Sequence, residues 1–257
     1  MIDVHFHLGS FPTLKEGKRL LLDSIANHPF ECALISHLDA TEFGEEDERV
    51  RVIDQMTALK EGLDFCKEHE GRFYLLVWIR PNFETPSKEF CDLIKKNLKY
   101  IKGLKMHPYC SRMRIDDPKV EPYLSLAEEL HLPILVHTAI DDYSSILHLE
   151  TVAKKHPNLV FIAAHMELYT DHDCTIEVMK RNPNIYCDTA WVEMKDAARA
   201  IEEVGKERVL FGSDTPLDGK TTLDEAIYQN YFHNAENLDE ESYALLMGGN
   251  AKRIFRI

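Results

Sequence analysis

Residues 133–165, PILVHTAIDDYSSILHLETVAKKHPNLVFIAAH, consist of two short apolar runs on either side of an amphipathic stretch. Both runs are rich in Val, Ile, Leu and Phe and lack a clean polar alternation, as strands of a parallel sheet buried on both faces require. Ser144–Lys155, between them, has the periodicity of a helix. The segment therefore predicts a strand–helix–strand unit whose two strands end in His137 and His165.

The same alternation continues from one end of the chain to the other. We predict strands over Ile2–His7, Glu31–His37, Phe73–Arg80, Gly103–His107, Pro133–His137, Leu159–His165, Ile185–Asp188 and Arg208–Asp214. We predict helices over Leu14–Asn27, Glu48–Glu68, Ser87–Lys99, Val120–His131, Ser144–Lys155, Asp173–Arg181, Met194–Val204 and Leu223–Phe232. Eight units in 257 residues average about 32 residues each, close to one strand–helix repeat.

This repeat predicts an α/β fold, a (β/α)8 TIM barrel that forms a single domain over residues 1–257. The tail from Leu238 predicts one additional C-terminal helix. An open, doubly wound sheet is the alternative, but eight regular repeats favour closure. No GxGxxG motif follows the first strand, so the usual signature of a dinucleotide-binding sheet is missing.

Composition narrows the classes of partner. Hydrophobic residues make up 44% of the chain and charged residues 29%, which is ordinary for a globular protein with a full core. The formal net charge is −14 with no basic stretch, so most of the surface would repel a nucleic-acid backbone. No apolar run approaches the ~20 residues that span a bilayer, and we expect no membrane partner. The six cysteines are scattered, which fits a reducing, cytoplasmic setting.

Unusual polar residues stand at the ends of the predicted strands. They are His5, His7, Lys105, His137, His165 and Asp214. In a (β/α)8 barrel the carboxyl ends of the strands surround one mouth, where the active site of this architecture lies. Six groups that are mostly remote in sequence are therefore predicted to converge on one small volume.

His5 and His7 are the first pair of candidate metal ligands. Side chains at i and i+2 of a strand share a face, so both imidazoles point the same way. Neutral imidazoles bind zinc at about 2.0–2.1 Å. Asp3 shares their face in a regular strand and is expected either to accept an imidazole N–H or to be an acid on the surface.

His137, His165 and Asp214 add three further ligand candidates. A single histidine at the end of an apolar strand is usually a hydrogen-bonded core residue, but two on consecutive strands after a His-x-His strand favour metal binding. Asp214 follows the apolar run Val209–Phe211. A carboxylate there is costly to bury unless it pairs with a cation, and a metal ion is such a cation.

These motifs occur in an order that resembles the amidohydrolase superfamily. They are Asp3-Val4-His5-Phe6-His7, Gly103-Leu104-Lys105-Met106-His107-Pro108, Val136-His137-Thr138, Ala164-His165-Met166, Gly212-Ser213-Asp214-Thr215-Pro216 and the closing Gly249-Asn250-Ala251-Lys252-Arg253-Ile254-Phe255. The likeness spans the whole chain. It is strongest to the branch that contains the TIM-barrel metal-dependent hydrolases and the aminocarboxymuconate-type decarboxylases.

The resemblance implies a metal centre. His5, His7 and Asp214 would bind one divalent metal, usually zinc, with Mn2+ or Fe2+ as alternatives. His137 would bind the same metal or a second one. In relatives with two metals, a lysine at the position of Lys105 is carboxylated and bridges them. In relatives with one metal, His165 orients the attacking water and Lys105 is free to bind a substrate carboxylate; the sequence leaves both arrangements open.

Other residues near the predicted mouth have two interpretations each. Arg80 would pair with an anionic substrate or form a structural salt bridge. His107 would contact the substrate or cap a loop. Trp191 would form a wall of the substrate pocket or be an ordinary exposed aromatic residue. Asp188 would orient a metal ligand or, by default, cap the next helix. His37 would line the pocket or be a hydrogen-bonded residue at a strand end.

We expect a hydrolase that acts on an amide, lactone or similar bond of a small, anionic molecule. A divalent metal lowers the pKa of a bound water toward ~7, Asp214 would act as general base and then general acid, and Lys105 or His165 would stabilise the oxyanion. The main alternative is a metal-dependent, non-oxidative decarboxylase of an aromatic or muconate-type carboxylate. A two-metal phosphoesterase and a non-catalytic binding barrel are further alternatives. We expect the partner to be a small-molecule substrate. The sequence is compatible with both a monomer and a homo-oligomer.

Overall fold

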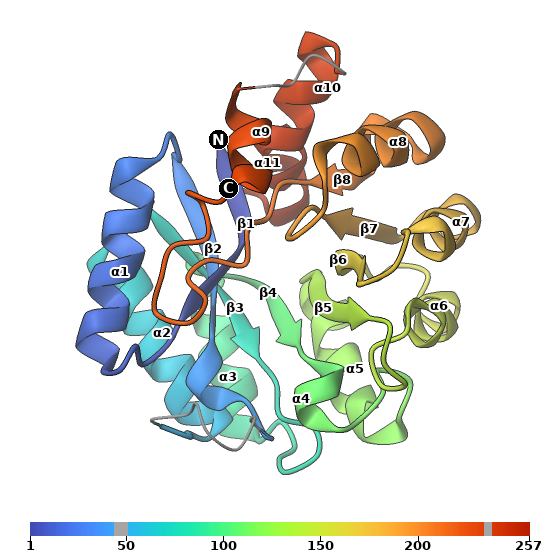
Figure 1. Ribbon diagram of the computed structural model, residues 1–257. Helices are drawn as coiled ribbons and strands as arrows, with labels where there is room; N and C mark the ends of the chain where they lie inside the picture. The colour runs from blue at the N-terminus through green and yellow to red at the C-terminus, as the bar shows by residue number, and fades with distance from the viewer. Residues whose placement is uncertain (44–50, 234–237) are drawn as a thin grey trace.

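The computed structural model describes residues 1–43, 51–233 and 238–257 of the chain. Eight parallel strands follow one another in chain order around a barrel, and helices cover its outside (Figure 1). The strands are β1 (Ile2–Leu8), β2 (Cys32–His37), β3 (Phe73–Trp78), β4 (Ile101–Met106), β5 (Ile134–Ala139), β6 (Phe161–Leu168), β7 (Ile185–Asp188) and β8 (Val209–Leu210). The predicted TIM barrel is confirmed.

The helices alternate with the strands, as expected from the repeat. They are α1 (Leu14–Asn27), α2 (Gln55–Glu68), α3 (Lys88–Lys96), α4 (Pro108–Ser111), α5 (Glu121–Leu130), α6 (Ile146–Lys155), α7 (Asp173–Arg181), α8 (Met194–Val204), α9 (Ala226–His233), α10 (Glu240–Ala244) and α11 (Asn250–Phe255). Among the described residues, no helix is long and apolar enough to cross a membrane.

The barrel closes between its last and first strands. The backbone N–H of Val4 donates to the carbonyl of Phe211 at 3.0 Å, and that of His7 donates to the carbonyl of Thr215 at 2.7 Å. The second bond comes from the segment after β8, which continues beside β1 although it has left the regular ladder. Closure therefore places the Asp214 region directly beside the two histidines of β1.

Apolar side chains pack on both faces of the sheet that forms the barrel. An inner cluster, including Val4, Leu76, Leu135 and Ile162, packs inside the strands and is closed at one end by Phe255 of α11. A larger cluster lies between the strands and the outer helices. The inner cluster fills the interior below the mouth. The polar side chains at the carboxyl ends of the strands lie above it.

Several predicted boundaries are wrong for local reasons. The strand predicted over Arg208–Asp214 keeps only two residues, because Arg208 lies in a short 3-10 turn and Asp214 adopts a left-handed backbone, φ 60°. The helix predicted from Glu48 begins at Gln55, capped by the Asp54 side chain; residues 48–50 lie outside the described part. The tail forms α10, a π-helical turn over Leu245–Gly249 and α11, where one helix was predicted.

Asn250, at the start of α11, fastens this tail to the barrel. Its buried side-chain amide donates to the carbonyl of Lys206 at 2.7 Å and to that of Val209 at 2.8 Å. Removal of a buried donor leaves its acceptors unsatisfied, and each such loss costs about 1–3 kcal/mol. These two hydrogen bonds hold the start of α11, with the Asn250-Ala251 pair, beside β8.

We predict that Asn250→Ala lowers the free energy of unfolding by about 2–4 kcal/mol, because two buried carbonyls lose their donor. Urea denaturation followed by circular dichroism measures it. Lys252→Ala is the matched control on the same helix, since its exposed ion pair with Glu31 is worth less than about 1 kcal/mol. Equal stability of Asn250→Ala and the parent protein would contradict this role.

Candidate functional site

The residues predicted at the strand ends meet at the mouth of the barrel. The Nε2 atoms of His5 and His7 lie 3.2 Å and 2.6 Å from the same oxygen, Oδ1 of Asp214. Lys105 of β4 places its Nζ 2.8 Å from Nε2 of His5. Residues from β1, β4 and the segment after β8 are thus within hydrogen-bonding distance of one another.

His165 and His137 complete the group. The ring of His165 is centred 5.0 Å from that of His5, and the ring of His137 lies 4.8 Å from that of His165. His5, His165 and Asp214 each offer one ligand atom within 4.8 Å of the others. The structure therefore brings together all six residues predicted as metal ligands, as the common rim of parallel strands requires.

The outer nitrogens of the imidazoles are held by the protein. Nδ1 of His5 lies 2.8 Å from Oδ2 of Asp188, and Nδ1 of His165 lies 3.1 Å from the carbonyl of Ala190. A carboxylate and a carbonyl can only accept, so each Nδ1 carries the proton and each Nε2 keeps its lone pair. Nδ1 of His7 pairs with the hydroxyl of Ser36 at 3.0 Å. This is the arrangement that orients histidines for metal binding.

Burial keeps the imidazoles of His5, His137 and His165 neutral. Desolvation, and then the charge of Lys105, lower the pKa of His5 to about 3. Burial is also the main reason why the pKa of His137 lies well below, and that of His165 below, the usual range. A neutral imidazole is the form that binds a metal, so the donor set of carboxylate and imidazole groups fits a divalent cation.

Lys105 is the cation within this group. Burial lowers the pKa of its ammonium to about 8. Its Nζ donates to Nε2 of His5, the nitrogen whose lone pair a metal would use. His5 cannot serve both partners at once, so binding of a metal by His5 requires Lys105 to give up this hydrogen bond.

Asp188 orients a candidate ligand, and the default prediction that it caps the next helix is wrong. It is fully buried; Oδ2 contacts His5, and Oδ1 accepts from the backbone N–H of His165 at 2.9 Å and of Ala190 at 3.1 Å. Burial acts to raise the pKa of this carboxyl, but His5 and the other partners leave it below its usual value. The residue before α8 is Glu193, which makes no capping bond.

Asp3 fulfils neither of its two predicted roles. The register of β1 against β2 shifts between Asp3 and Phe6, so the regular alternation that gave Asp3 the face of the two histidines does not apply. Oδ1 of Asp3 accepts from the backbone N–H groups of His5 at 2.9 Å and Ser213 at 3.2 Å. Asp3 is fully buried and ties β1 to the segment that carries Asp214.

Three residues of the site adopt a left-handed backbone. The φ angles are 66° for His165, 59° for Trp191 and 60° for Asp214. Such a conformation costs a residue other than glycine about 1–3 kcal/mol and persists only where surrounding contacts hold it. The bends turn these side chains into the mouth, and nothing in the sequence indicated them.

Trp191 contacts the candidate general base directly. Its indole N–H donates to Oδ2 of Asp214 at 2.9 Å, and its backbone N–H donates to the hydroxyl of Tyr228 at 2.9 Å. Oδ2 of Asp214 is therefore occupied by an indole, while Oδ1 faces His5 and His7. Trp191 was predicted either to form a wall of the pocket or to be an ordinary exposed aromatic residue, and it is half-buried. Tyr228, on the distant α9, gave no signal in the sequence.

The remaining predicted residues divide between the mouth and its surroundings. Nδ1 of His107 accepts from the backbone N–H of Cys110, which caps α4, and its ring stacks 3.7 Å from that of His137. Arg80 pairs with Glu84 at 2.7 Å, the structural salt bridge that was its second interpretation. Nε2 of His37 pairs with Glu61 at 3.1 Å, as a histidine satisfied at the end of its strand.

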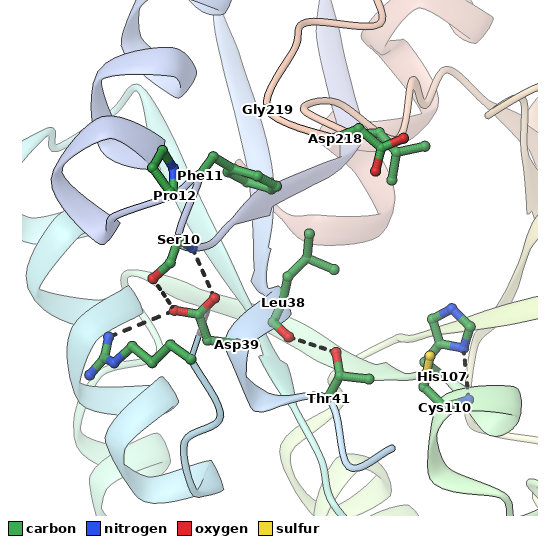
Figure 2. A pocket seen from close by; sticks show the side chains of 12 residues that line it. Ser10, Phe11, Pro12, Leu38, Asp39, Thr41, His107, Cys110, Asp218 and Gly219 are labelled. Atoms are coloured by element: carbon green, nitrogen blue, oxygen red, sulfur yellow. Dashed lines mark hydrogen bonds and ion pairs between the residues drawn. The ribbon is translucent and has the colours of Figure 1, made fainter. Parts of the chain in front are cut away.

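A pocket of about 600 Å³ reaches the mouth of the barrel at His107, whose ring stacks on that of His137. Figure 2 shows His107 at one side of it, Leu38 and Thr41 in the middle, and Asp218 and Gly219 on the loop after β8. Arg51, which the sequence did not single out, also lines it. Its size is that of an ordinary small-molecule site.

Comparison with known proteins gives a family and a set of structural relatives. The model of the amidohydrolase family ("Amidohydrolase") matches residues 2–257. A search of curated proteins finds no match.

Several solved structures share the fold at low sequence identity. A manganese-bound 5-carboxyvanillate decarboxylase from Novosphingobium aromaticivorans is 12% identical with TM-score 0.75, covering 100% of this chain and 97% of that one. A 2,6-dihydroxybenzoate decarboxylase is 14% identical with TM-score 0.72, covering 100% and 99%. A 4-oxalomesaconate hydratase from Rhodopseudomonas palustris is 13% identical with TM-score 0.69, covering 100% and 95%. With a family model that matches nearly every residue and the barrel that accompanies it, this chain belongs to the amidohydrolase family.

Proposed function

We propose that this protein is a divalent-metal-dependent hydrolase that cleaves an ester, lactone or amide bond of a small molecule. One observation carries the proposal: Nε2 of His5 and Nε2 of His7 converge on Oδ1 of Asp214. Two imidazole nitrogens and a carboxylate oxygen meet there, and these are the donor types that coordinate zinc. Such a set is built for a cation.

His5, His7 and Asp214 would hold the first metal, with His137 and His165 beside it as further ligands. Zinc suits imidazole and carboxylate donors; manganese is the metal of the related decarboxylase structure. A bound divalent metal supplies an acidified water and polarises the scissile carbonyl. A lysine at the position of Lys105, next to His5, is compatible with either one or two metals.

Asp214 and Lys105 would carry the proton transfer and the hydrogen-bond donation of the reaction. Asp214 accepts the proton of the attacking water as the new carbon–oxygen bond forms, and returns it to the leaving oxygen or nitrogen as the old bond breaks. Trp191 fixes the other carboxylate oxygen through its indole N–H, which keeps Asp214 in one orientation. Lys105, whose pKa of about 8 leaves it mostly protonated at neutral pH, can donate to the developing oxyanion.

We predict that the purified protein contains stoichiometric Zn, Mn or Fe and that His5→Ala lowers both metal content and kcat/KM by at least about 100-fold, because a ligand is lost. Elemental analysis and a panel of small esters, lactones and amides measure these effects. His233→Ala, an exposed histidine on α9, is the control and keeps both properties. A metal-free parent protein, or an unchanged His5→Ala variant, would refute the metal centre.

We predict that Asp188→Asn weakens metal binding by about 10–100-fold while the barrel stays folded, since the variant keeps the shape but no longer fixes the His5 tautomer. Competition with a chromogenic chelator measures the dissociation constant, and circular dichroism verifies the fold. Excess metal should restore part of the activity. Unchanged affinity in Asp188→Asn would show that orientation of His5 by this carboxylate is unimportant.

Decarboxylation is the second candidate, because two of the structures described above are decarboxylases of hydroxylated aromatic acids. The same ligands would serve, but Asp214 or a histidine would deliver its proton to carbon. We predict that the ester, lactone or amide panel is turned over and that 2,6-dihydroxybenzoate and 5-carboxyvanillate release no carbon dioxide. Carbon dioxide release without any hydrolysis would reverse the order of the two candidates.

A further inference from the structure

We propose that the 600 Å³ pocket selects a substrate whose end remote from the scissile bond is a protonated amine carried on an apolar linker. This inference rests on the proposed function, because the scissile group must lie at the metal-binding residues. It runs against the anionic substrate expected from the sequence, at least for the remote end of the molecule.

The pocket extends between His107, at the mouth of the barrel, and the loop after β8. His107, whose ring stacks on His137, lines the inner part. Phe11, Leu38 and Leu217 provide apolar lining. Asp218 follows Leu217 on the loop after β8 (Figure 2). A molecule anchored at the metal would therefore pass an apolar stretch before its remote end approaches Asp218.

Arg51, the cation that lines the pocket, is already paired with carboxylates of the protein. Arg51 is the one Arg or Lys that lines the pocket within the described part of the chain. Both of its terminal nitrogens pair with Glu61, at 2.8 Å and 2.6 Å, and Asp39 lies 3.7 Å away. The guanidinium of Arg51 is thus already paired with carboxylates of the protein, so Arg51 offers little attraction to a substrate anion.

The two acids of the pocket are in different states. Asp39 is buried and its oxygens accept from the backbone N–H and hydroxyl of Ser10, at 2.9 Å and 2.7 Å. Asp218 is exposed and makes no hydrogen bond or ion pair with the residues that the structure describes. Lys220, on the same turn, is not among the lining residues. Among the described residues that line the pocket, Asp218 is therefore the charged side chain that has no partner.

Arg80, the other cation predicted to receive an anion, is paired with Glu84 and does not line the pocket. A carboxylate at the remote end would face Asp218 without a free counter-charge. An ammonium there would donate a charge-assisted hydrogen bond to the carboxylate of Asp218. The sign of the free charge thus favours an amine over a carboxylate at this end.

Three hydroxamic acids of equal length test the inference. The hydroxamate group chelates a divalent metal, and the tails are those of 6-aminohexanoyl, heptanoyl and adipoyl monohydroxamate. We expect isothermal titration of the zinc-loaded protein to rank them amine, neutral, carboxylate, with at least about a fivefold difference between the first and last, as one partly exposed charge contact allows. Asp218→Asn should reduce this ratio below about twofold.

Glu225→Gln is the matched control, since it removes one exposed acid that does not line the pocket and should leave the ranking intact. Equal binding of the three tails, or tighter binding of the carboxylate, would overturn this inference and leave the hydrolase proposal standing. Binding in the expected order without turnover of any ester, lactone or amide would overturn hydrolysis alone. If no hydroxamate binds, the metal centre fails, and this inference fails with it.

Discussion

The buried carboxylate of Asp188 is the interaction on which the site depends. One oxygen holds Nδ1 of His5, and the other accepts the backbone N–H groups of His165 and Ala190. A charge with no exposed surface is costly unless every lone pair is used. These hydrogen bonds of Asp188 set the orientation of the His5 ring and the backbone path at His165. The Nε2 lone pairs of His5 and His165 are thereby directed into the mouth.

The barrel also stabilises local conformations that are unfavourable alone. His165, Trp191 and Asp214 lie in left-handed backbone, and each would relax if the strands around it were less tightly packed. The inner apolar cluster below the mouth supplies that rigidity, and α11 closes its lower end through Phe255. Packing at one end of the barrel therefore supports geometry at the other, which matters because reacting groups must be held to fractions of an ångström.

Reaction centre and pocket have different electrostatic characters. At the mouth of the barrel, burial keeps His5, His137 and His165 neutral, which is the form in which an imidazole binds a cation. In the pocket, Arg51 pairs with Glu61, and among the described lining residues the unpaired charge is that of Asp218. Hydrolysis and decarboxylation would use the same centre and differ in whether the proton goes to a heteroatom or to carbon. The charge of the pocket would select the remote end of the substrate in the same way for either reaction.

The sequence by itself determined the barrel and the six residues at its mouth. Both follow from local rules: strand and helix periodicities are visible in short windows, and the carboxyl ends of parallel strands must share a rim. Tertiary structure decided which partners those residues find. The irregularity in β1 directs Asp3 to backbone amides, and Asp188 reaches His5 across 183 residues. Arg51, which lines the pocket, pairs with Glu61, and Arg80, which does not line it, pairs with Glu84. Hydrogen bonds between remote segments depend on side-chain positions within ångströms, which no periodicity in the sequence specifies.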